Sequence, residues 1–555
     1  MGTGKHILEY VYDNEQRYSG KTWFTQPVSG GNVTTYSWSD AMQQARSMAA
    51  HLQSLGYEPG SKIAMVSKNC AHFMMAELAI WMAGYVTVAL YPTVNADTAK
   101  YVLSHSDAKL LFVGKLDTWE EILPGVPEDM PRIAFPLAPS NDYAQWDEIV
   151  TSTDPMTDNP QPDRDALAMI IYTSGSTGVP KGVMHSFDAI SRAGEGIVRG
   201  LKFCPDDRVL SYLPLAHVFE RAYIETTTYI AATHVFFAEA LETFVADLNR
   251  ARPTLFISVP RLWLKFQLGV FQKMPAKKLD FLLKIPVLSG VIKKKVLGGL
   301  GLDCVRLAGS GSAPIPADLI AWYRKLGLNL LEGYAMSEDF AYSHLSNEQY
   351  NEPGYVGVPY PEVDVKISDE GEILIKSPGK MMGYYKEEAM TAECFTEDGF
   401  FKTGDRGERR EPSGLLKITG RVKEIFKTSK GKYVAPAPIE NMINNHPAIE
   451  LSCVSGSGRP QPYAQVVLSE ELRAKRQSTD ITGEVGAALG ELLKSVNSNV
   501  EHHERLAFLV VAGDEWSTSN GMLTPTMKIR RGAIEDAAET HVDDWYTESE
   551  DVLWA

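Results

Sequence analysis

Glycines and hydroxyl-bearing residues are concentrated in residues 172–182, which read YTSGSTGVPKG. The apolar run 166–171 precedes them and predicts a buried strand that leads into a loop. Glycines let a backbone turn tightly and bring several N–H groups onto one concave surface, which suits phosphate oxygens. A flexible surface turn is the alternative. The residues expected to bind a polyphosphate are Thr173, Ser174, Gly175, Ser176, Thr177, Gly178 and Lys181.

The order of residues in this loop disfavours an ordinary P-loop NTPase. A Walker A loop ends in Gly-Lys-Ser/Thr, with the glycine and the lysine adjacent. Here Val179 and Pro180 separate Gly178 from Lys181.

Three later segments carry other groups that a bound nucleotide needs. Tyr334 could stack on a base, and Glu338, four residues on, could hold a divalent cation that bridges phosphates. Asp405 follows a turn, where its carboxylate could accept hydrogen bonds from both hydroxyls of a ribose. Each segment alone is more often a simple turn or a solvated acid, so their order along the chain carries the inference. The backbone expected to approach the base contains Gly309, Ser310, Gly311 and Ser312.

The composition is that of a soluble globular enzyme, with 44% hydrophobic and 22% charged residues in 555. The net charge of −16 argues against nucleic acid as a partner, since no basic surplus exists to neutralise phosphates. The N-terminal residues contain no apolar signal core, which predicts a cytoplasmic protein. The cysteines lie far apart, which favours a reducing compartment and argues against a disulfide framework or a structural zinc site: Cys70, Cys204, Cys304, Cys394 and Cys453.

Helical and strand-like segments alternate from about residue 34 to residue 165. Ser39 is expected to cap a helix over residues 40–55. Residues 71–82 and 86–90 predict a buried helix and a buried strand, which we favour over a membrane span because Gly84 and Pro92 break the run. Residues 124–162 are rich in proline and aspartate and predict an irregular connection.

The fold class predicted from this pattern is α/β. We expect a large N-terminal domain, residues 1–422, of mainly parallel sheets flanked by helices. Short strand-like segments between Gly, Pro and Asp turns predict a β-rich subdomain at about 355–420. Residues 423–555 are expected to form a small α+β C-terminal domain.

Residues 273–299 form a basic amphipathic segment in which lysines alternate with leucine, isoleucine and phenylalanine. Such a segment can lie on an anionic membrane surface. A solvated helix face is the more common structure, so both alternatives stay open. The lysines are Lys273, Lys277, Lys278, Lys284, Lys293, Lys294 and Lys295.

The ordered motifs resemble those of the adenylate-forming (acyl-CoA synthetase) superfamily over residues 34–531. The matching segments are 172–182, 333–338, 402–405, 419–424 and 523–528. Within the superfamily, the chain resembles the long-chain fatty acyl-CoA ligase branch at residues 90–93, 213–221, 259–263 and 432–436. One departure is Ser337, where the family usually has threonine.

The resemblance implies a role for each matching residue in adenylation. Lys528 would be the catalytic lysine that bridges a carboxylate and the α-phosphate, and His217 would line the acyl site, although a hydrogen-bonded core histidine is the alternative. Asp405 and Arg421 would fix the ribose, and Thr173 and Glu338 would hold Mg²⁺. The remaining nucleotide contacts would come from Gly333, Tyr334, Ala335, Met336 and Ser337.

The resemblance also implies that residues 423–555 form a mobile lid that pivots about Lys423 to admit coenzyme A. The family hinge is often aspartate, so lysine is a second departure. Residues just past the hinge could contact the phosphates of coenzyme A, and a solvated basic loop is the alternative: Lys427, Lys430, Gly431 and Lys432.

The function implied is an ATP-dependent ligase that activates a long-chain fatty acid as an acyl-adenylate and transfers it to coenzyme A, with release of AMP and pyrophosphate. One alternative is a fatty acyl-AMP ligase, or another adenylate-forming ligase that uses a carrier protein or a different acid. A second alternative is a peripheral lipid-binding protein with a vestigial nucleotide site. Peripheral membrane contact and a homodimer are left open by the sequence.

Overall fold

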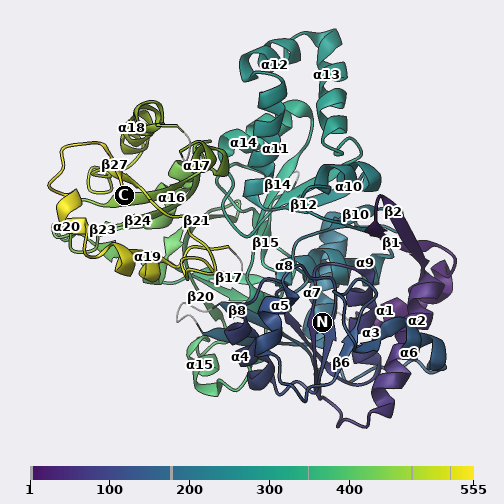
Figure 1. Cartoon of the computed structure of the whole chain (residues 1–555). Helices are drawn as coiled ribbons and strands as arrows, with labels where there is room; N and C mark the ends of the chain where they lie inside the picture. Colours follow the sequence, from purple (N-terminus) through teal and green to yellow (C-terminus); the bar gives the residue numbers. More distant parts are fainter. Residues whose placement is uncertain (1–3, 175–178, 348, 477–478, 525–526) are drawn as a thin grey trace. The chain divides into compact units, whose positions relative to one another are not determined.

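The computed structural model describes residues 4–174, 179–347, 349–476, 479–524 and 527–555 of the chain. Within them the chain forms two compact units (Figure 1). The first unit contains the residues before 353 together with 356–365 and 375–401, and the second contains 353–355, 366–374 and 402–555. The chain therefore crosses between the units more than once.

An eight-stranded sheet lies in the first unit, in the order β19-β9-β8-β4-β3-β5-β6-β7. The strands from β8 to β7 in this order are parallel, whereas β9 and β19 run antiparallel to their neighbours. The predicted mainly parallel sheet is therefore confirmed. The strands are β3 (Lys62–Val66), β4 (Val86–Leu90), β5 (Leu110–Val113), β6 (Arg132–Ala134), β7 (Ala144–Gln145), β8 (Leu167–Ser174), β9 (Pro180–Ser186) and β19 (Gly383–Tyr384).

Two smaller sheets complete the first unit, with the orders β12-β13-β14-β15-β16 and β10-β11-β1-β2. β12, β13 and β14 are parallel to one another, so their carboxyl ends lie at one edge. The strands are β1 (Thr22–Ser29), β2 (Asn32–Ser37), β10 (Arg208–Ser211), β11 (His234–Phe237), β12 (Leu255–Ser258), β13 (Leu307–Ser310), β14 (Leu330–Tyr334), β15 (His344–Leu345) and β16 (Val358–Pro359).

Helices flank these sheets (Figure 1). They are α1 (Ile7–Tyr18), α2 (Trp38–Ser54), α3 (Ala71–Met82), α4 (Ala96–Ser106), α5 (Trp119–Ile122), η1 (Leu123–Gly125), α6 (Trp146–Ser152), α7 (Phe187–Leu201), α8 (Val218–Glu220), η2 (Arg221–Thr226), α9 (Thr227–Ala231), α10 (Phe244–Ala251), α11 (Pro260–Lys273), α12 (Ala276–Leu283), α13 (Pro286–Gly299), α14 (Ala317–Leu326), η3 (Ser337–Asp339) and α15 (Glu388–Glu393).

Two details of the predicted chain path are wrong. Ser37, not Ser39, caps α2: its Oγ accepts from the N–H of Asp40 at 3.1 Å, and Asp40 accepts from the N–H of Ser37 at 3.0 Å. This reciprocal pair satisfies two backbone donors that a helix start leaves unpaired. Residues 124–162 are also not wholly irregular, because β6, β7 and α6 lie there and extend the main sheet.

The buried helix predicted at residues 71–82 is confirmed as α3, in which every residue is buried. Its one charged residue, Glu77, pairs with Arg221 of η2, whose Nη1 lies 2.5 and 2.7 Å from the two carboxylate oxygens. Both side chains are at most 1% exposed. Glu225 lies 3.4 Å from the same guanidinium nitrogen. Among the described residues, no helix is long and apolar enough to cross a membrane.

The later part of the chain contains three further sheets, β17-β18-β20-β21, β22-β23 and β24-β25-β26-β27. The β-rich stretch predicted near 355–420 contains the first of them. Their strands are β17 (Asp364–Ile367), β18 (Glu372–Lys376), β20 (Phe401–Arg410), β21 (Leu415–Arg421), β22 (Phe426–Lys427), β23 (Tyr433–Val434), β24 (Ile449–Ser455), β25 (Tyr463–Leu468), β26 (Leu509–Val511) and β27 (Val552–Trp554).

The core of the second unit forms between the β24–β27 sheet and its helices. One face of α18 buries Val485, Leu489, Leu493 and Val496, a spacing that keeps all four on one side of a helix. The acidic C-terminal segment ends in β27, which lies parallel to β26. The helical elements are η4 (Val422–Glu424), α16 (Pro436–Asn444), α17 (Glu470–Arg476), α18 (Thr482–Ser498), α19 (Arg531–Ala538) and α20 (Val542–Trp545).

Replacing Glu77 by glutamine tests the buried ion pair. The substitution leaves the Arg221 guanidinium buried without its main counter-charge, so we expect the free energy of unfolding to fall by about 3–5 kcal/mol. Urea denaturation followed by tryptophan fluorescence measures the change. Glu362→Gln, which removes a surface partner 2.7 Å from Arg192, is the control and should change stability by less than about 1 kcal/mol. Equal effects of the two substitutions would contradict the assignment.

Candidate active site

The predicted phosphate loop connects two paired strands. β8 continues to Ser174, past the predicted strand end, and β9 returns antiparallel to it, so Thr173 lies opposite Lys181. Gly182 lies in this ladder, and a Cβ there would meet the Ile170 Cγ2 atom at 2.7 Å. Glycine is therefore required for the strands to pack. Residues 175–178, which carry Gly175, Ser176, Thr177 and Gly178 of the prediction, lie outside the described residues.

Tyr384 links the lysine of this hairpin to the predicted metal-binding carboxylate. β19 pairs with β9 and places Tyr384 opposite Val183. The Tyr384 hydroxyl donates to Oε1 of Glu338 at 2.7 Å, and the Lys181 Nζ lies 5.5 Å from the centre of the tyrosine ring. Burial, followed by the charge of Glu338, raises the pKa of Tyr384. The hydroxyl therefore stays protonated and acts as a donor.

Buried groups support the turn that carries Glu338. The neighbouring Asp339 is 3% exposed, and its Oδ1 accepts from the N–H of Met336 at 3.0 Å. Burial raises the pKa of Asp339 to about 8, so this carboxyl is mostly neutral at pH 7. His185 lies 2.8 Å from the carbonyl of Ser337, and burial lowers its pKa to about 4. Since a carbonyl only accepts, neutral His185 donates through Nε2.

The segment predicted to meet the base begins at the carboxyl end of β13. Gly309 and Ser310 form the last residues of this strand, and Ser310 lies opposite Glu332 of β14. The Ser310 hydroxyl is buried and has no hydrogen-bond partner within the described residues. Burial also raises the pKa of Glu332 to about 7. Polar groups of this kind suit a ligand that arrives with its own donors and acceptors.

Tyr334 closes β14, where it lies opposite His344 of β15, and the two ring centres are 6.0 Å apart. Gly333 precedes it in the same strand, whereas Ala335 and Met336 follow the strand end. The predicted stacking residue is thus held at the edge of the parallel strands, where open α/β sheets bind ligands.

His217 lies next to the same segment. It caps α8, with its Nδ1 accepting from the N–H of Phe219 at 3.1 Å, and its ring centre lies 6.5 Å from that of Tyr91. A Cβ added to Gly311 would approach the Phe219 ring to 3.1 Å. Phe219, two residues after His217, therefore lies against the backbone predicted to bind the base.

Asp405 and Arg421 are brought together in the second unit. They lie opposite each other on β20 and β21, and the Arg421 Nε donates to Oδ1 of Asp405 at 2.9 Å. Thr403 and Gly404, which precede Asp405, are held by hydrogen bonds to β18: Thr403 donates to the Ile373 carbonyl at 2.8 Å, and the Gly404 N–H to Glu372 at 2.8 Å. The arginine therefore orients the carboxylate.

Lys423 lies exposed in η4, directly after β21. Lys427 pairs with Tyr433 across a hairpin that Gly431 turns at a φ of 78°. Lys430 and Lys432 lie on the same hairpin, and all three of its lysines are exposed. The hairpin therefore presents clustered positive charge to solvent.

Lys528 and Thr524 are joined by two hydrogen bonds. The N–H of Lys528 donates to the Thr524 hydroxyl at 3.1 Å, and the N–H of Thr524 donates to the Lys528 carbonyl at 2.8 Å. The preceding Met527 has a φ of 61°, in the left-handed region. Lys528 is exposed.

Within each unit the structure brings together residues that are remote in sequence. Lys181 and Glu338 share Tyr384, and Asp405 pairs with Arg421. Sequence reasoning missed Tyr384 and the neutral Asp339. A Gly-Tyr-Tyr run marks residues 383–385, but nothing local to it indicates pairing with β9.

Protein-family models match both parts of the chain. The model described as "AMP-binding enzyme" matches residues 11–385, and the model described as "AMP-binding enzyme C-terminal domain" matches residues 423–550. Among solved structures, the A domain of the carboxylic acid reductase from Segniliparus rugosus, in complex with AMP and a co-purified carboxylic acid, superposes with a TM-score of 0.80. It is 22% identical, over 99% of this chain and 95% of that chain.

The anthranilate CoA ligase AuaEII, in complex with anthranoyl-AMP, gives a TM-score of 0.78 at 20% identity, over 98% of this chain and 99% of that one. The fold is therefore that of the adenylate-forming enzymes. By sequence, the long-chain-fatty-acid–CoA ligase FadD15 of Mycobacterium tuberculosis is 30% identical over 98% of both chains. Human long-chain-fatty-acid–CoA ligase 1 is 29% identical over 88% of this chain and 79% of its own.

The chain belongs to the AMP-binding enzyme family, within its long-chain fatty acyl-CoA ligase branch. The resemblance carried by the sequence motifs is thereby confirmed.

Asp339→Asn tests whether the buried carboxyl is neutral. Because its pKa in the folded protein is about 8, above that of an unfolded aspartate, Asp339 stabilises the fold below pH 4 and loses this contribution as pH rises to about 8. The contribution of the permanently neutral asparagine does not change with pH. The melting temperature of the variant relative to wild type should therefore rise between pH 5 and pH 8 in a thermal-shift series.

Asp318→Asn, at an exposed aspartate, is the matched control. Its melting temperature should change with pH in parallel with that of wild type over the same range. A constant offset between Asp339→Asn and wild type would show that the buried carboxyl is ionised.

Proposed function

We propose that this protein is an ATP-dependent ligase that activates a long-chain fatty acid as an acyl-adenylate and transfers it to coenzyme A. The observation that carries the proposal is the similarity to relatives named long-chain-fatty-acid–CoA ligases, which extends over 98% of this chain. The intact Glu338, Asp405, Arg421 and Lys528 argue against a vestigial nucleotide site. The relatives' names favour coenzyme A over a carrier protein as the acceptor.

In the first half-reaction, the fatty acid carboxylate attacks the α-phosphorus of ATP, and pyrophosphate leaves. The physical obstacle is the approach of two anions. The Lys528 ammonium bridges the carboxylate and the α-phosphate, and the hairpin residues from Thr173 to Lys181 donate to the leaving phosphates. Asp405, held by Arg421 at 2.9 Å, accepts from the ribose hydroxyls. Tyr334 and the backbone of residues 309–312 hold the adenine.

The residues present fit a magnesium ion. Mg²⁺ prefers oxygen ligands and is commonly held by one or two carboxylates together with substrate phosphates. Glu338 supplies a half-buried carboxylate fixed by Tyr384, and the Thr173 hydroxyl lies on the strand that ends at the predicted phosphate loop. When bound there, Mg²⁺ neutralises negative charge on the phosphate oxygens.

In the second half-reaction, the thiolate of coenzyme A attacks the adenylate carbonyl and AMP leaves. We assign residues 1–422 to the adenylating domain and residues 423–555 to a lid that pivots about Lys423 between the two half-reactions. The cationic hairpin of Lys427, Lys430 and Lys432 contacts the phosphates of coenzyme A. His217 lines the acyl site beside residues 309–312.

We further propose a cytoplasmic location. The sequence leaves a homodimer open. Sedimentation velocity, which gives the mass of the particle in solution, tests it.

Incubation with ATP, coenzyme A and fatty acids of graded length tests the function. We expect AMP and acyl-CoA in equal amounts, with the highest kcat/KM for long chains. Lys528→Ala should lower the rate of adenylation by about 10²–10³-fold while ATP still binds, because it removes one aimed cationic donor. Lys417→Ala, at an exposed lysine of β21, is the control and should match wild type. Acyl-adenylate without any acyl-CoA would refute the coenzyme A ligase.

The double substitution Lys430→Ala/Lys432→Ala tests the hairpin. Losing hydrogen bonds between a cation and a phosphate should raise the KM for coenzyme A by about 10-fold or more. Release of pyrophosphate in the absence of coenzyme A should stay at the wild-type rate, because this loop has no part in adenylation. An unchanged KM would assign these lysines to a solvated loop.

A further inference from the structure

Helices α12 and α13 form an arm, residues 276–299, that projects from the first unit (Figure 1). None of the residues of α13 is buried, and Leu279 is the one buried residue of α12. A helix usually buries an apolar stripe against its neighbours to offset the cost of ordering. This hairpin therefore exposes apolar surface that the rest of the unit does not cover.

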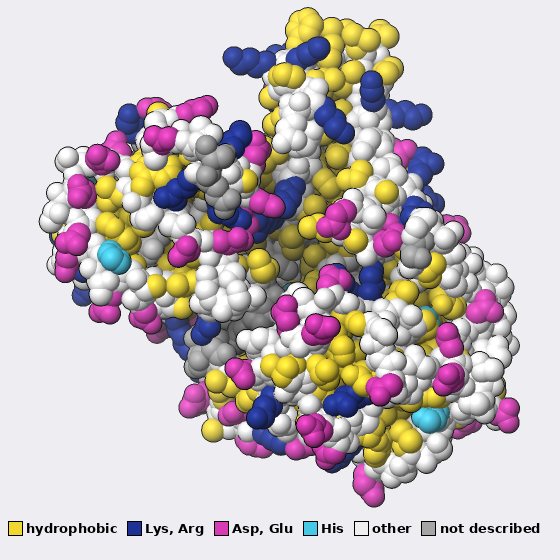
Figure 2. Space-filling view, in the orientation of Figure 1, with side chains coloured by type: hydrophobic (Ala, Val, Ile, Leu, Met, Phe, Trp, Pro, Cys, Tyr) yellow, Lys and Arg dark blue, Asp and Glu magenta, His cyan; other side chains and the backbone are white. Residues whose placement is uncertain are grey.

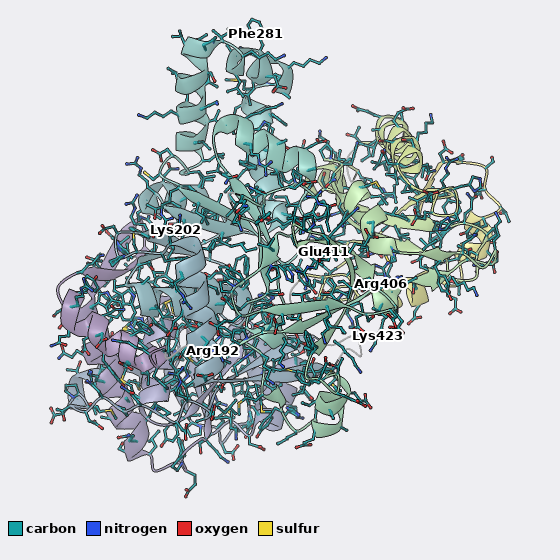
Figure 3. All side chains as sticks on the ribbon, turned by 180° about the vertical axis from the view of Figure 1, so that it is seen from behind. Arg192, Lys202, Phe281, Arg406, Glu411 and Lys423 are labelled. Atoms are coloured by element: carbon teal, nitrogen blue, oxygen red, sulfur yellow. The ribbon has the colours of Figure 1, made fainter. Side chains whose placement is uncertain are left out.

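The exposed apolar side chains gather at the end of the arm. Phe281 is 65% exposed, Val287 85% and Val291 63%, and Leu288 beside them is 42% exposed. Phe281 lies at the far end of the hairpin (Figure 3), and the end is covered by hydrophobic side chains (Figure 2). A contiguous exposed apolar patch of this kind usually marks an interaction site.

The arm is also strongly basic in an acidic protein. Residues 276–299 contain six lysines and one acid, Asp280, whereas the whole chain has a net charge of −16. The Asp280 carboxylate lies 3.5 Å from Lys325 of α14, so its charge is partly matched from outside the arm. Basic side chains project from the sides of the arm (Figure 2). The lysines are Lys277, Lys278, Lys284, Lys293, Lys294 and Lys295.

We infer that this arm docks the protein onto an anionic lipid bilayer, with its apolar end in the headgroup and acyl boundary. Val287 and Lys294 are seven residues apart on α13, which is about 10 Å along a helix axis. Apolar faces of interfacial helices enter the boundary by about 5–10 Å, so the lysines would meet the lipid phosphates as the end enters. The long lysine side chains reach outward to the headgroups from this depth.

A second copy of the chain fits this surface poorly. Two arms that meet end to end would bring their lysines together, and like charges repel. An acidic protein would satisfy the lysines, but it would need an apolar hollow for Phe281 and Val287 as well. The bilayer surface offers both properties at once, and the inference does not depend on the substrate assigned above.

Co-sedimentation of the full chain with vesicles tests the inference. We expect binding to vesicles of phosphatidylcholine with phosphatidylglycerol, and little binding to phosphatidylcholine alone. Since each lysine near such a surface contributes a several-fold factor, Lys293→Gln/Lys294→Gln/Lys295→Gln should weaken binding by about 100-fold. Phe281→Ser/Val287→Ser should weaken it without changing charge. Added salt should weaken wild-type binding.

A matched control removes the same charge elsewhere in the first unit. Lys109→Gln/Lys202→Gln/Lys376→Gln changes three exposed lysines outside the arm and should bind like wild type; Lys202 lies far from Phe281 in Figure 3. Equal loss in the control and arm variants would overturn the inference, as would wild-type binding that the arm variants retain. A cooperative thermal unfolding transition like that of wild type checks that every variant is folded.

Sedimentation velocity without lipid separates docking from self-association. A dimer that Phe281→Ser/Val287→Ser dissociates would assign the arm to a second copy and overturn the inference. If no acyl-CoA forms in the ligase assay, the proposed function fails while vesicle binding can still be measured, so the two failures are distinguishable.

Discussion

The antiparallel return of β9 along β8 is the constraint on which the first unit's site depends. The rest of the main sheet from β8 to β7 is parallel, and a parallel strand would need a long crossover before it could pair. The hairpin instead sets Thr173 opposite Lys181 after a short connection. It also leaves β9 with a free edge, to which β19 adds Tyr384. One pairing thus joins the predicted phosphate loop to the carboxylate of Glu338.

The buried polar groups of the first unit are of two kinds. Glu77 and Arg221 form an ion pair at 2.5 Å inside a fully buried helix contact. Within the part of the chain that the structure describes, no cation pairs with Asp339, Glu332 or Glu220, and burial raises the pKa of each carboxyl, to about 8, 7 and 8. Burial without a partner cation favours the neutral form of these three acids.

The residues proposed to bind the adenine and the lysines proposed to contact the substrates lie in different surroundings. Gly309, Ser310 and Tyr334 lie at strand ends within a packed unit, where sheet pairing fixes them. Lys423, Lys528 and the lysines of the β22–β23 hairpin are exposed instead. Long cationic side chains that are exposed can approach an anionic substrate and withdraw from it without disturbing a core. The lysines of the arm formed by α12 and α13 are likewise long cationic side chains, which we infer to contact anionic lipid.

The sequence by itself determined the adenylate-forming family, the α/β class and most elements. Helix α3 and strand β4 were predicted to the residue, since apolar runs bounded by Gly84 and Pro92 are local signals. The order of the glycine and acidic motifs can likewise be seen in the sequence without knowledge of the fold. Helix caps and short strands were less predictable. The cap of α2 is Ser37 and not the predicted Ser39, and β6 and β7 lie in a stretch that was predicted to be irregular.

Only the tertiary structure decided which distant groups share a site. Tyr384 reaches Glu338 because β19 joins a strand formed two hundred residues earlier, and no local pattern encodes that register. The charge state of Asp339 was equally hidden, because it depends on the atoms that surround the carboxyl and not on its neighbours in sequence. Residues 276–299 read as basic and amphipathic, but exposure of the apolar side depended on what packs against it. Local sequence sets helices, strands and turns, whereas partners and burial are set by contacts between segments remote in the chain.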